Sequence, residues 1–397
     1  MAEKINVPEI RFTGFVDPWE QRKFSDLSDR VSIQSSDSDL PQVEYEDIIP
    51  GEGTLNKDLR DKKGGKTGIK FYAGDVLYGK LRPYLMNWLY PQFNGVAVGD
   101  FWVLRATECD SSFLYRLVQT GSFQRLANVS SGSKMPRADW NLISQSFFAV
   151  PADHAEQKAI AKGLAELDTL ITLHQRKYDK LCVLKKSMLD KMFPKGGSLY
   201  PEIRFAGFTD PWEQRKLGDI LQERNVRTSD FESNPIFSLT IEDGITPKTD
   251  RYERTSLITK TEDLFKIVSP NEFVTNPMNL RFGAFGYNKN SLSVCVSGYY
   301  DVFSIDNDKC SGFWNSYFKT PVALKRFDDA ATGSLIEKRR VKYSTLCQLI
   351  FLMPKGMGEK KQIGAFFDRL DSLITLHQRK LELLRNIKKS MLDKMFV

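Results

Sequence analysis

The sequence contains few cysteines and no long apolar run. Its 397 residues include five cysteines, at positions 109, 182, 295, 310 and 347, which are odd in number, far apart and without a Cys-x-x-Cys pair. This pattern disfavours both a disulfide framework and a zinc site. No run approaches the ~18 consecutive apolar residues of a membrane span, and the start of the chain has no apolar signal core. We therefore expect a cytoplasmic protein with no membrane segment.

Motifs of catalysis are also scarce. Three histidines leave little material for metal binding or acid–base chemistry, and the chain has neither a P-loop nor a Gly-x-Ser-x-Gly motif. The Glu-x-Lys triplets at Glu156–Lys158 and Glu359–Lys361 resemble those of nucleases, but both stand where a helix is expected to begin rather than on a strand. Asn276–Asn279 lacks the second proline and the aromatic residue of the adenine-methyltransferase box. The sequence therefore predicts a non-catalytic chain.

The composition is that of a globular protein, with 41% apolar and 27% charged residues. Its net charge of +7 gives it a weak electrostatic attraction for polyanions. The charge is unevenly distributed, because residues 26–61 contain three basic and ten acidic residues, whereas residues 62–150 contain eleven basic and five acidic ones. This segregation favours a basic surface on one part of the first domain, although a solvated surface of mixed charge is an open alternative.

Two lead segments repeat almost identically. PEIRFTGFVDPWEQRKF occupies Pro8–Phe24 and PEIRFAGFTDPWEQRKL occupies Pro201–Leu217. The Asp-Pro-Trp step favours an extended, turning path, because the residue before proline is disfavoured in a helix. We expect Trp19 and Trp212 to anchor packing.

Two further blocks also repeat, LITLHQRK and KKSMLDKMF, first within residues 170–193 and again within residues 373–396. Around them apolar residues recur at alternating steps of three and four, the average of 3.5 that is typical of a coiled coil. Each proline-free run predicts a helix of roughly 35 residues and about 50 Å. The proposed interface residues are Ile160, Leu164, Leu167, Ile171, His174, Tyr178, Leu181, Ile363, Phe367, Leu370, Ile374, His377, Leu381 and Leu384, with Lys185 and Lys388 as further polar positions of the seam.

The duplication predicts that the two helices pair with each other in antiparallel orientation. The alternative is that each helix packs separately on its own domain. A lead segment follows the first helix but not the second, so by symmetry Met1–Phe24 should pack near Phe396. The chain termini would then be close together, and circular permutation would be tolerated.

Between lead segment and helix lie two regions, about 25–150 and 218–353, that do not resemble each other in detail. Short strand-like pieces and helical signals predict two mixed α/β domains. The strand-like pieces are 68–72, 75–78, 97–104, 145–150, 236–240, 264–268, 272–275, 292–296, 300–305 and 348–353, and the helical pieces are 111–126 and 312–327. The predicted fold is α+β with a pseudo-twofold internal repeat, divided at 1–150, 151–195, 196–353 and 354–397.

Clusters of basic, amide and aromatic residues occur at corresponding ends of both variable regions. Lys and Arg can neutralise phosphates, while Arg and Asn can read base edges through paired hydrogen bonds. Each residue taken alone is equally compatible with a solvated surface charge. The candidate DNA-binding residues are Lys80, Arg82, Tyr84, Lys134 and Arg137 in the first region, and Asn279, Arg281, Tyr287, Lys289, Lys338, Arg339, Arg340 and Lys342 in the second, where Asn288 also lies in the Gly-rich stretch.

The whole arrangement resembles a type I restriction–modification specificity subunit. The resemblance rests on the repeated PWEQRK, LITLHQRK and KKSMLDKMF blocks and on GDVLYGKLRPYL at Gly74–Leu85. It implies two target-recognition domains that each read one half of a bipartite, asymmetric double-stranded DNA site, with the helices fixing the gap between half-sites. It also implies docking of two modification subunits, which bind S-adenosylmethionine and methylate adenine, and of restriction subunits that use ATP and Mg. This chain itself is expected to bind no cofactor and to have no catalytic residues.

Three other functions stay open at this stage. A free-standing sequence-specific DNA-binding regulator would explain two reading domains but not the long shared helices. An enzyme that acts on DNA unaided is disfavoured by the missing cofactor loop and acidic cluster. A scaffold without DNA contact would be distinguished by a DNA-binding measurement.

Overall fold

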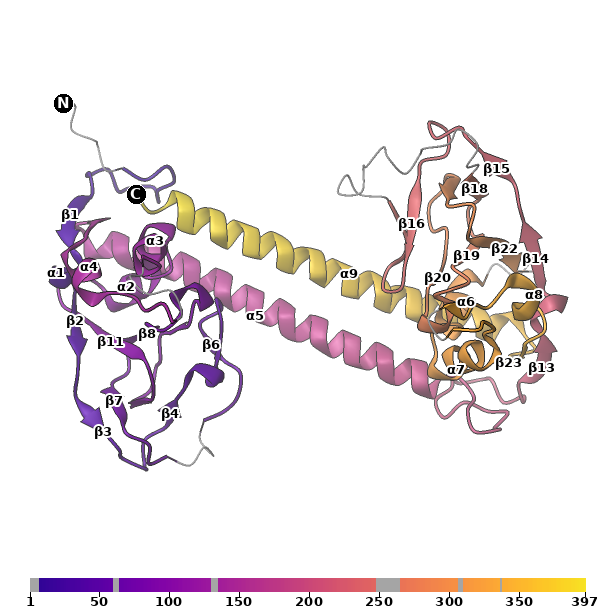
Figure 1. The fold of residues 1–397 in the computed structure, drawn as a ribbon, viewed down its shortest axis with the longest axis horizontal. Coiled ribbons are helices and arrows are strands. Elements are labelled where there is room, and N and C mark those ends of the chain that lie inside the picture. The colour runs from indigo at the N-terminus through magenta and orange to yellow at the C-terminus, as the bar shows by residue number, and fades with distance from the viewer. Residues whose placement is uncertain (1–6, 60–63, 130–134, 248–264, 306–309, 336–337) are drawn as a thin grey trace. The chain divides into compact units, whose positions relative to one another are not determined.

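The computed structural model describes residues 7–59, 64–129, 135–247, 265–305, 310–335 and 338–397. The chain divides into two compact units (Figure 1). The first unit comprises Met1–Arg176 and Gln378–Val397, and the second comprises Lys177–His377. Two 38-residue helices, α5 (His154–Lys191) and α9 (Met357–Lys394), each contribute residues to both units. The first unit is therefore assembled from two segments that are distant in sequence, whereas the second is one continuous segment.

The variable domain of the first unit contains two four-stranded sheets. Strand β11 (Phe101–Ala106) is rich in aromatic and β-branched residues and lies at the centre of its sheet, where four of its side chains are buried. This sheet has the order β2 (Ser28–Val31), β11, β8 (Val76–Gly79), β9 (Trp88–Leu89). The other has the order β3 (Gln34–Ser35), β7 (Gly68–Phe71), β10 (Gly95–Ala97), β4 (Gln42–Val43), and a small ribbon joins β5 (Ile48–Ile49) to β6 (Thr54–Leu55).

Short helices cover this domain and border its core. Asp110 caps α2 (Ser111–Leu117) by accepting hydrogen bonds from the backbone of Ser112 and Phe113, and Thr120 caps α3 (Gly121–Ala127) in the same way. The cap at Thr120 explains why the helical signals near residues 111–126 correspond to two helices rather than one. The remaining short helices are α1 (Phe24–Leu27) and α4 (Trp140–Gln145). Phe24 at the core contacts the rings of Phe123, Trp140 and Phe148.

The second unit repeats the main sheet with a different sequence. Its order is β14 (Leu221–Arg224), β22 (Asp301–Ile305), β19 (Phe273–Thr275), β20 (Phe285–Tyr287), which matches β2-β11-β8-β9 of the first unit. The accompanying strands differ: β15 (Arg227–Thr228), β18 (Phe265–Val268) and β21 (Val294–Val296) form one sheet, and β16 (Phe237–Thr240) pairs with β17 (Gly244–Pro247). Its helices are α6 (Ser311–Tyr317), α7 (Pro321–Ala330) and α8 (Tyr343–Leu346).

Most predicted strands occur within a few residues of their expected positions, but two predicted elements are wrong in form. The piece 97–104 is not one strand, because the chain turns at Gly99 (φ +107°) and passes from β10 in one sheet to β11 in the other. The predicted helix 312–327 is two helices, α6 and α7, because Thr320 caps a new helix whose first residue is Pro321.

Each lead segment is fastened to the start of a long helix by a buried glutamate. In the first unit, Nε and Nη2 of Arg11 donate to the two carboxylate oxygens of Glu156 at 2.6 and 2.7 Å, and Nε1 of Trp19 donates to Oε1 at 3.3 Å. In the second unit, Arg204 and Trp212 make the same three contacts with Glu359, at 2.7, 2.8 and 3.2 Å. Strand β1 (Glu20–Lys23) then pairs with β12 (Phe147–Val150), as β13 (Glu213–Lys216) pairs with β23 (Ile350–Met353).

The end of the opposite long helix completes this junction. Phe396 lies edge-on to Trp19 with ring centroids 6.1 Å apart and stacks on Phe113 at 5.4 Å. The backbone N–H of Ile10 donates to the carbonyl of Lys394 at 3.0 Å. The prediction that the first lead segment packs near Phe396 is confirmed, and the C-terminal end of α9 lies at the N-terminal domain in Figure 1. Phe193 holds the equivalent place against Trp212 and Phe313 in the second unit.

The two long helices are antiparallel in each unit. In the first unit, Asp168 contacts Lys388 at 2.6 Å while Gln175, further along α5, contacts Arg385. In the second unit, Lys185 contacts Asp371 at 2.6 Å, and Phe193 lies 5.9 Å from Phe367 between ring centroids. All fourteen proposed interface residues are buried or half-buried, from Ile160 to Leu181 on α5 and from Ile363 to Leu384 on α9.

A separate question is whether any helix could cross a membrane. Among the residues that the structure describes, none has both the length and the apolar composition that this would require.

Because Glu156 and Glu359 are buried and paired, we expect that replacing either carboxylate by a neutral amide causes a large loss of stability. Glu156 is 1% exposed, so Glu156→Gln should leave the guanidinium of Arg11 without its counterion and lower the free energy of unfolding by about 2–3 kcal/mol. Glu359→Gln should have the same effect through Arg204. Urea unfolding measures both, with the exposed Glu166→Gln on the same helix as the control. Equal unfolding midpoints for Glu156→Gln and Glu166→Gln would show that this junction does not stabilise the unit.

Candidate functional site

A hairpin loop between β8 and β9 carries most candidate residues of the first domain. This first loop, Lys80–Asn87, includes the short 3-10 helix η2 (Pro83–Leu85). Arg82 before it has φ +50°, a left-handed conformation that is uncommon for arginine. The backbone holds the loop against the segment before α4, because the N–H of Arg82 donates to the carbonyl of Pro136 and the N–H of Ala138 donates to that of Lys80, both at 2.8 Å.

The first loop presents cations and apolar side chains together. Arg82 and Tyr84 are exposed, and Tyr84 is 53% exposed, next to the exposed Leu85 and Met86. Lys80 and Arg137 share Asp100, whose carboxylate oxygens lie 3.5 and 3.0 Å from their nitrogens, and Arg137 is also exposed. Burial alone would raise the pKa of Asp100, but the hydrogen bond from Arg137 and the charges of Arg137 and Lys80 outweigh it and hold that pKa below its usual value.

Asp100 was not recognised as part of this cluster from the sequence. It lies directly before β11, and only the pairing of β11 with β8 brings it to the loop. The candidate residue Lys134 lies outside the described residues.

A second loop, Asn276–Ala284, occupies the corresponding position in the second domain, between β19 and β20. The N–H of Val341 donates to the carbonyl of Pro277 at 2.9 Å, so this loop also docks on the segment before the last short helix. Arg340 and Arg137 correspond, because each lies three residues before the first residue of that helix, Tyr343 in α8 or Trp140 in α4. The two loops share a place in the fold but not a sequence.

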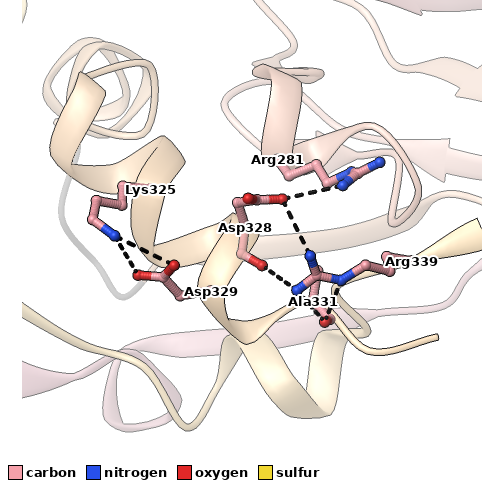
Figure 2. Close-up of polar contacts among 6 residues, drawn as sticks. All are labelled: Arg281, Lys325, Asp328, Asp329, Ala331 and Arg339. Atoms are coloured by element: carbon pink, nitrogen blue, oxygen red, sulfur yellow. Dashed lines mark hydrogen bonds and ion pairs between the residues drawn. The ribbon is translucent and has the colours of Figure 1, made fainter. Parts of the chain in front are cut away.

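Two candidate arginines of the second domain are committed to internal contacts. Nη1 of Arg281 lies 3.1 Å from Oδ1 of Asp328, and its guanidinium is 4.4 Å from the centre of the Phe282 ring. Arg339 donates to the carbonyls of Asp328 and Ala331 at 2.8–3.1 Å, at the C-terminal end of α7, as Figure 2 shows. These contacts fasten the second loop and the following segment to α7.

At and beside the second loop, four other candidates have exposed side chains. Asn279 lies in the second loop itself, and Lys338, Arg340 and Lys342 lie in the segment that docks on it. These exposed residues form the accessible polar surface beside the loop.

Tyr287, Asn288 and Lys289 form a separate group. Tyr287 was expected in a Gly-rich loop, but it ends strand β20, because Phe285 and Tyr287 alternate with Gly286 as β20 pairs with β19. Burial, followed by the charge of Asp368, raises the pKa of Tyr287, and its hydroxyl donates to Asp368 of α9 at 3.2 Å. Lys289 also contacts Asp368, at 3.4 Å. Asn288 is buried and donates to two backbone carbonyls. This group therefore joins the domain to α9.

The part of the chain that the structure describes contains no group of three or more His, Cys, Asp or Glu side chains able to hold a metal ion. The exposed polar surfaces at the two loops bring together many of the candidate residues. Hydrogen-bonding and cationic side chains beside exposed aromatic and apolar groups suit a polyanion whose bases can also be contacted.

Comparison with known proteins gives two informative similarities and no matching family model. The specificity subunit of the type I restriction enzyme EcoDI from Escherichia coli is 24% identical over 204 residues, which are 48% of this chain and 46% of that protein. The match therefore spans about half the length of each.

The crystal structure of the S subunit of a type I restriction–modification system from M. genitalium superposes with a TM-score of 0.60 at 12% identity. That superposition covers 98% of this chain and 99% of the other, which establishes a shared fold. The chain thus shares the fold of that S subunit and is similar in sequence, over about half its length, to the EcoDI specificity subunit.

Proposed function

We propose that this chain is the sequence-recognition subunit of a type I restriction–modification complex. In this proposal each domain reads one half of a bipartite, asymmetric site in double-stranded DNA. The observation that carries the proposal is the pair of hairpin loops, which occupy corresponding positions on a repeated frame yet present different exposed side chains. A repeated frame with two unlike surfaces suits two unrelated half-sites on one ligand.

The chemistry of the loops supports DNA as that ligand. Arg82 in the first loop and Arg340 and Lys342 beside the second are exposed cations able to neutralise phosphates. Tyr84 and Asn279 are exposed in the same places and offer a stacking surface and a paired donor and acceptor. We further propose that the chain docks two modification subunits and, through them, restriction subunits, and acts in the cytoplasm.

In this proposal the chain itself is non-catalytic and binds no cofactor. S-adenosylmethionine and ATP with Mg would be bound by the partner subunits. Methylome sequencing of cells that express the modification subunits with and without this chain tests the whole proposal. Methylation at a bipartite site should depend on the chain, whereas the same methylated motif without it would refute the assignment.

Arg82 provides a test of the first loop. Arg82→Ala should weaken binding of the assembled complex to cognate DNA about tenfold and reduce the salt dependence of affinity by about one counterion, because one phosphate contact is lost. DNA binding measured at several salt concentrations gives both values. Arg125→Ala, an exposed arginine of the same domain outside the loop, is the matched control. Parallel salt plots for wild type and Arg82→Ala would remove Arg82 from the interface.

Two neighbouring arginines should separate stability from binding in the second domain. Arg339→Ala removes hydrogen bonds to the carbonyls at the end of α7 and should lower the free energy of unfolding by about 1–3 kcal/mol. Arg340→Ala removes an exposed side chain and should leave stability unchanged while weakening DNA binding about tenfold. Thermal unfolding and DNA binding are measured on both variants. A stability loss confined to Arg340→Ala would reverse these assignments.

The lengths of α5 and α9 should determine the gap between half-sites. One heptad inserted into both helices, after Arg176 and after His377, adds about 10 Å of helix, or roughly three base pairs of DNA at 3.4 Å each. The methylated motif should keep both half-sites and gain spacer length. Inserting the heptad into α5 alone is the control and should abolish methylation, because the two helices would lose register. Altered half-sites with an unaltered gap would contradict the role of the helices.

A further inference from the structure

A pocket of about 380 Å³ lies beside the second loop. Pro277 of the loop forms part of its wall, and the acidic residues Glu223 and Asp301 come from neighbouring strands β14 and β22. Tyr299, Tyr343, Arg340 and Lys342 complete the lining apart from a serine. The pocket therefore combines carboxylates and aromatic rings with two cations of the exposed surface already described.

The equivalent position in the first domain is filled by side chains. Strand register gives the equivalence. The first residues of β14 and β2, Leu221 and Ser28, pair with the last residues of the central strands, Ile305 and Ala106. Counting two residues along each strand, the pair Glu223 and Phe303 corresponds to the pair Arg30 and Leu104. Two residues earlier on the central strands, Asp301 thus corresponds to Trp102. Trp102 stacks on Tyr78 at 5.8 Å between ring centroids and lies edge-on to Trp140 at 5.3 Å, while Arg30 covers Trp140 at 5.1 Å.

The packed side chains that fill this position in the first domain therefore have no counterparts in the second domain. Aspartate replaces a tryptophan at the centre, glutamate replaces the covering arginine, and Tyr343 replaces Trp140. Since the surrounding sheet order is unchanged, the hollow is a property of these side chains rather than of a different fold. The pocket is therefore a feature of the loop surface of the second domain, and the equivalent side chains of the first domain fill that position.

The pocket has cations at exposed positions and a carboxylate, that of Asp301, at a less exposed position. Arg340 and Lys342 are exposed, and among the described residues neither forms an ion pair. Asp301 is partly buried, and burial, with the nearby charge of Glu223, raises its pKa despite the opposing charge of Lys266. A partly buried carboxylate next to a second one repels phosphate and favours a hydrogen-bond donor.

We propose that this pocket reads one base of the DNA half-site bound by the second domain, with Asp301 accepting a hydrogen bond from an exocyclic amino group. Cytosine N4 and adenine N6 are the amino donors that the major groove displays, and carboxylates pair with such donors. Glu223 supplies the second acceptor, while Arg340 and Lys342 bind the flanking phosphates. This inference rests on the proposed function.

The test is methylome sequencing of cells that contain the complex with Asp301→Asn or Glu223→Gln. Each substitution keeps the shape of the side chain and adds an N–H donor, so bases that display acceptors become acceptable. Discrimination at one position of the second half-site should fall about tenfold to a hundredfold, while the first half-site and the spacer stay the same. Asp219→Asn, an exposed carboxylate of the same domain outside the pocket, should keep the wild-type motif.

Two results would overturn the inference. One is an unchanged motif with wild-type methylation rates in both Asp301→Asn and Glu223→Gln. The other is an unchanged motif with equally reduced methylation at every site, because that would indicate loss of general affinity rather than of base reading. The proposed function fails separately, if the wild-type complex itself methylates no bipartite site. Unfolding temperatures of the variants, expected to be close to wild type, verify that the domain is intact.

Discussion

The buried carboxylates of Glu156 and Glu359 are the constraint on which both units depend. An ionised carboxylate removed from water is costly unless it is paired and fully hydrogen-bonded. Each of these carboxylates accepts hydrogen bonds from Nε and Nη2 of an arginine and from the indole N–H of a tryptophan, and these donors lie in a lead segment 137 to 155 residues earlier in the chain. The start of a long helix is thereby fixed to the start of a domain, and the phenylalanine that ends the other helix packs on the same tryptophan.

This junction is the same in both units, although the exposed loop surfaces of the two domains differ. The repeated residues lie where the lead segment, the last strand and the helices meet, and they leave the hairpin loops free to vary. Within the conserved sheet order, exchanging Trp102 and Arg30 of one domain for Asp301 and Glu223 of the other turns a packed aromatic cluster into a polar pocket. Such exchanges change the side chains beside the second loop, while the glutamate junction is the same in both units.

The sequence predicted the parts of the fold that are expressed as repetition or periodicity. The long helices, the closeness of Phe396 to the lead segment and most strands could be read in this way. What it missed depends on strand pairing between distant segments. Asp100 joins the first loop only because β11 pairs with β8, and the pocket at Asp301 exists only because β14 and β22 are neighbours. The different environments of Arg339 and Arg340 likewise depend on the carbonyls at the end of α7. The sequence of the basic run at residues 338–342 does not indicate which arginine reaches them.

The orientation of the helices follows from a charge pattern that the sequence contains. Lys185 and Lys388 hold equivalent seam positions in the two copies, as do Asp168 and Asp371. A parallel pairing of the copies would set lysine against lysine and aspartate against aspartate. The antiparallel pairing instead places Lys388 on Asp168 and Lys185 on Asp371, both at 2.6 Å and with the lysine side chains 13% and 27% exposed. Because partly buried charges are weakly screened, the repulsion in the parallel arrangement would persist in salt. Polar seam pairs of this kind specify orientation and register more than they add stability.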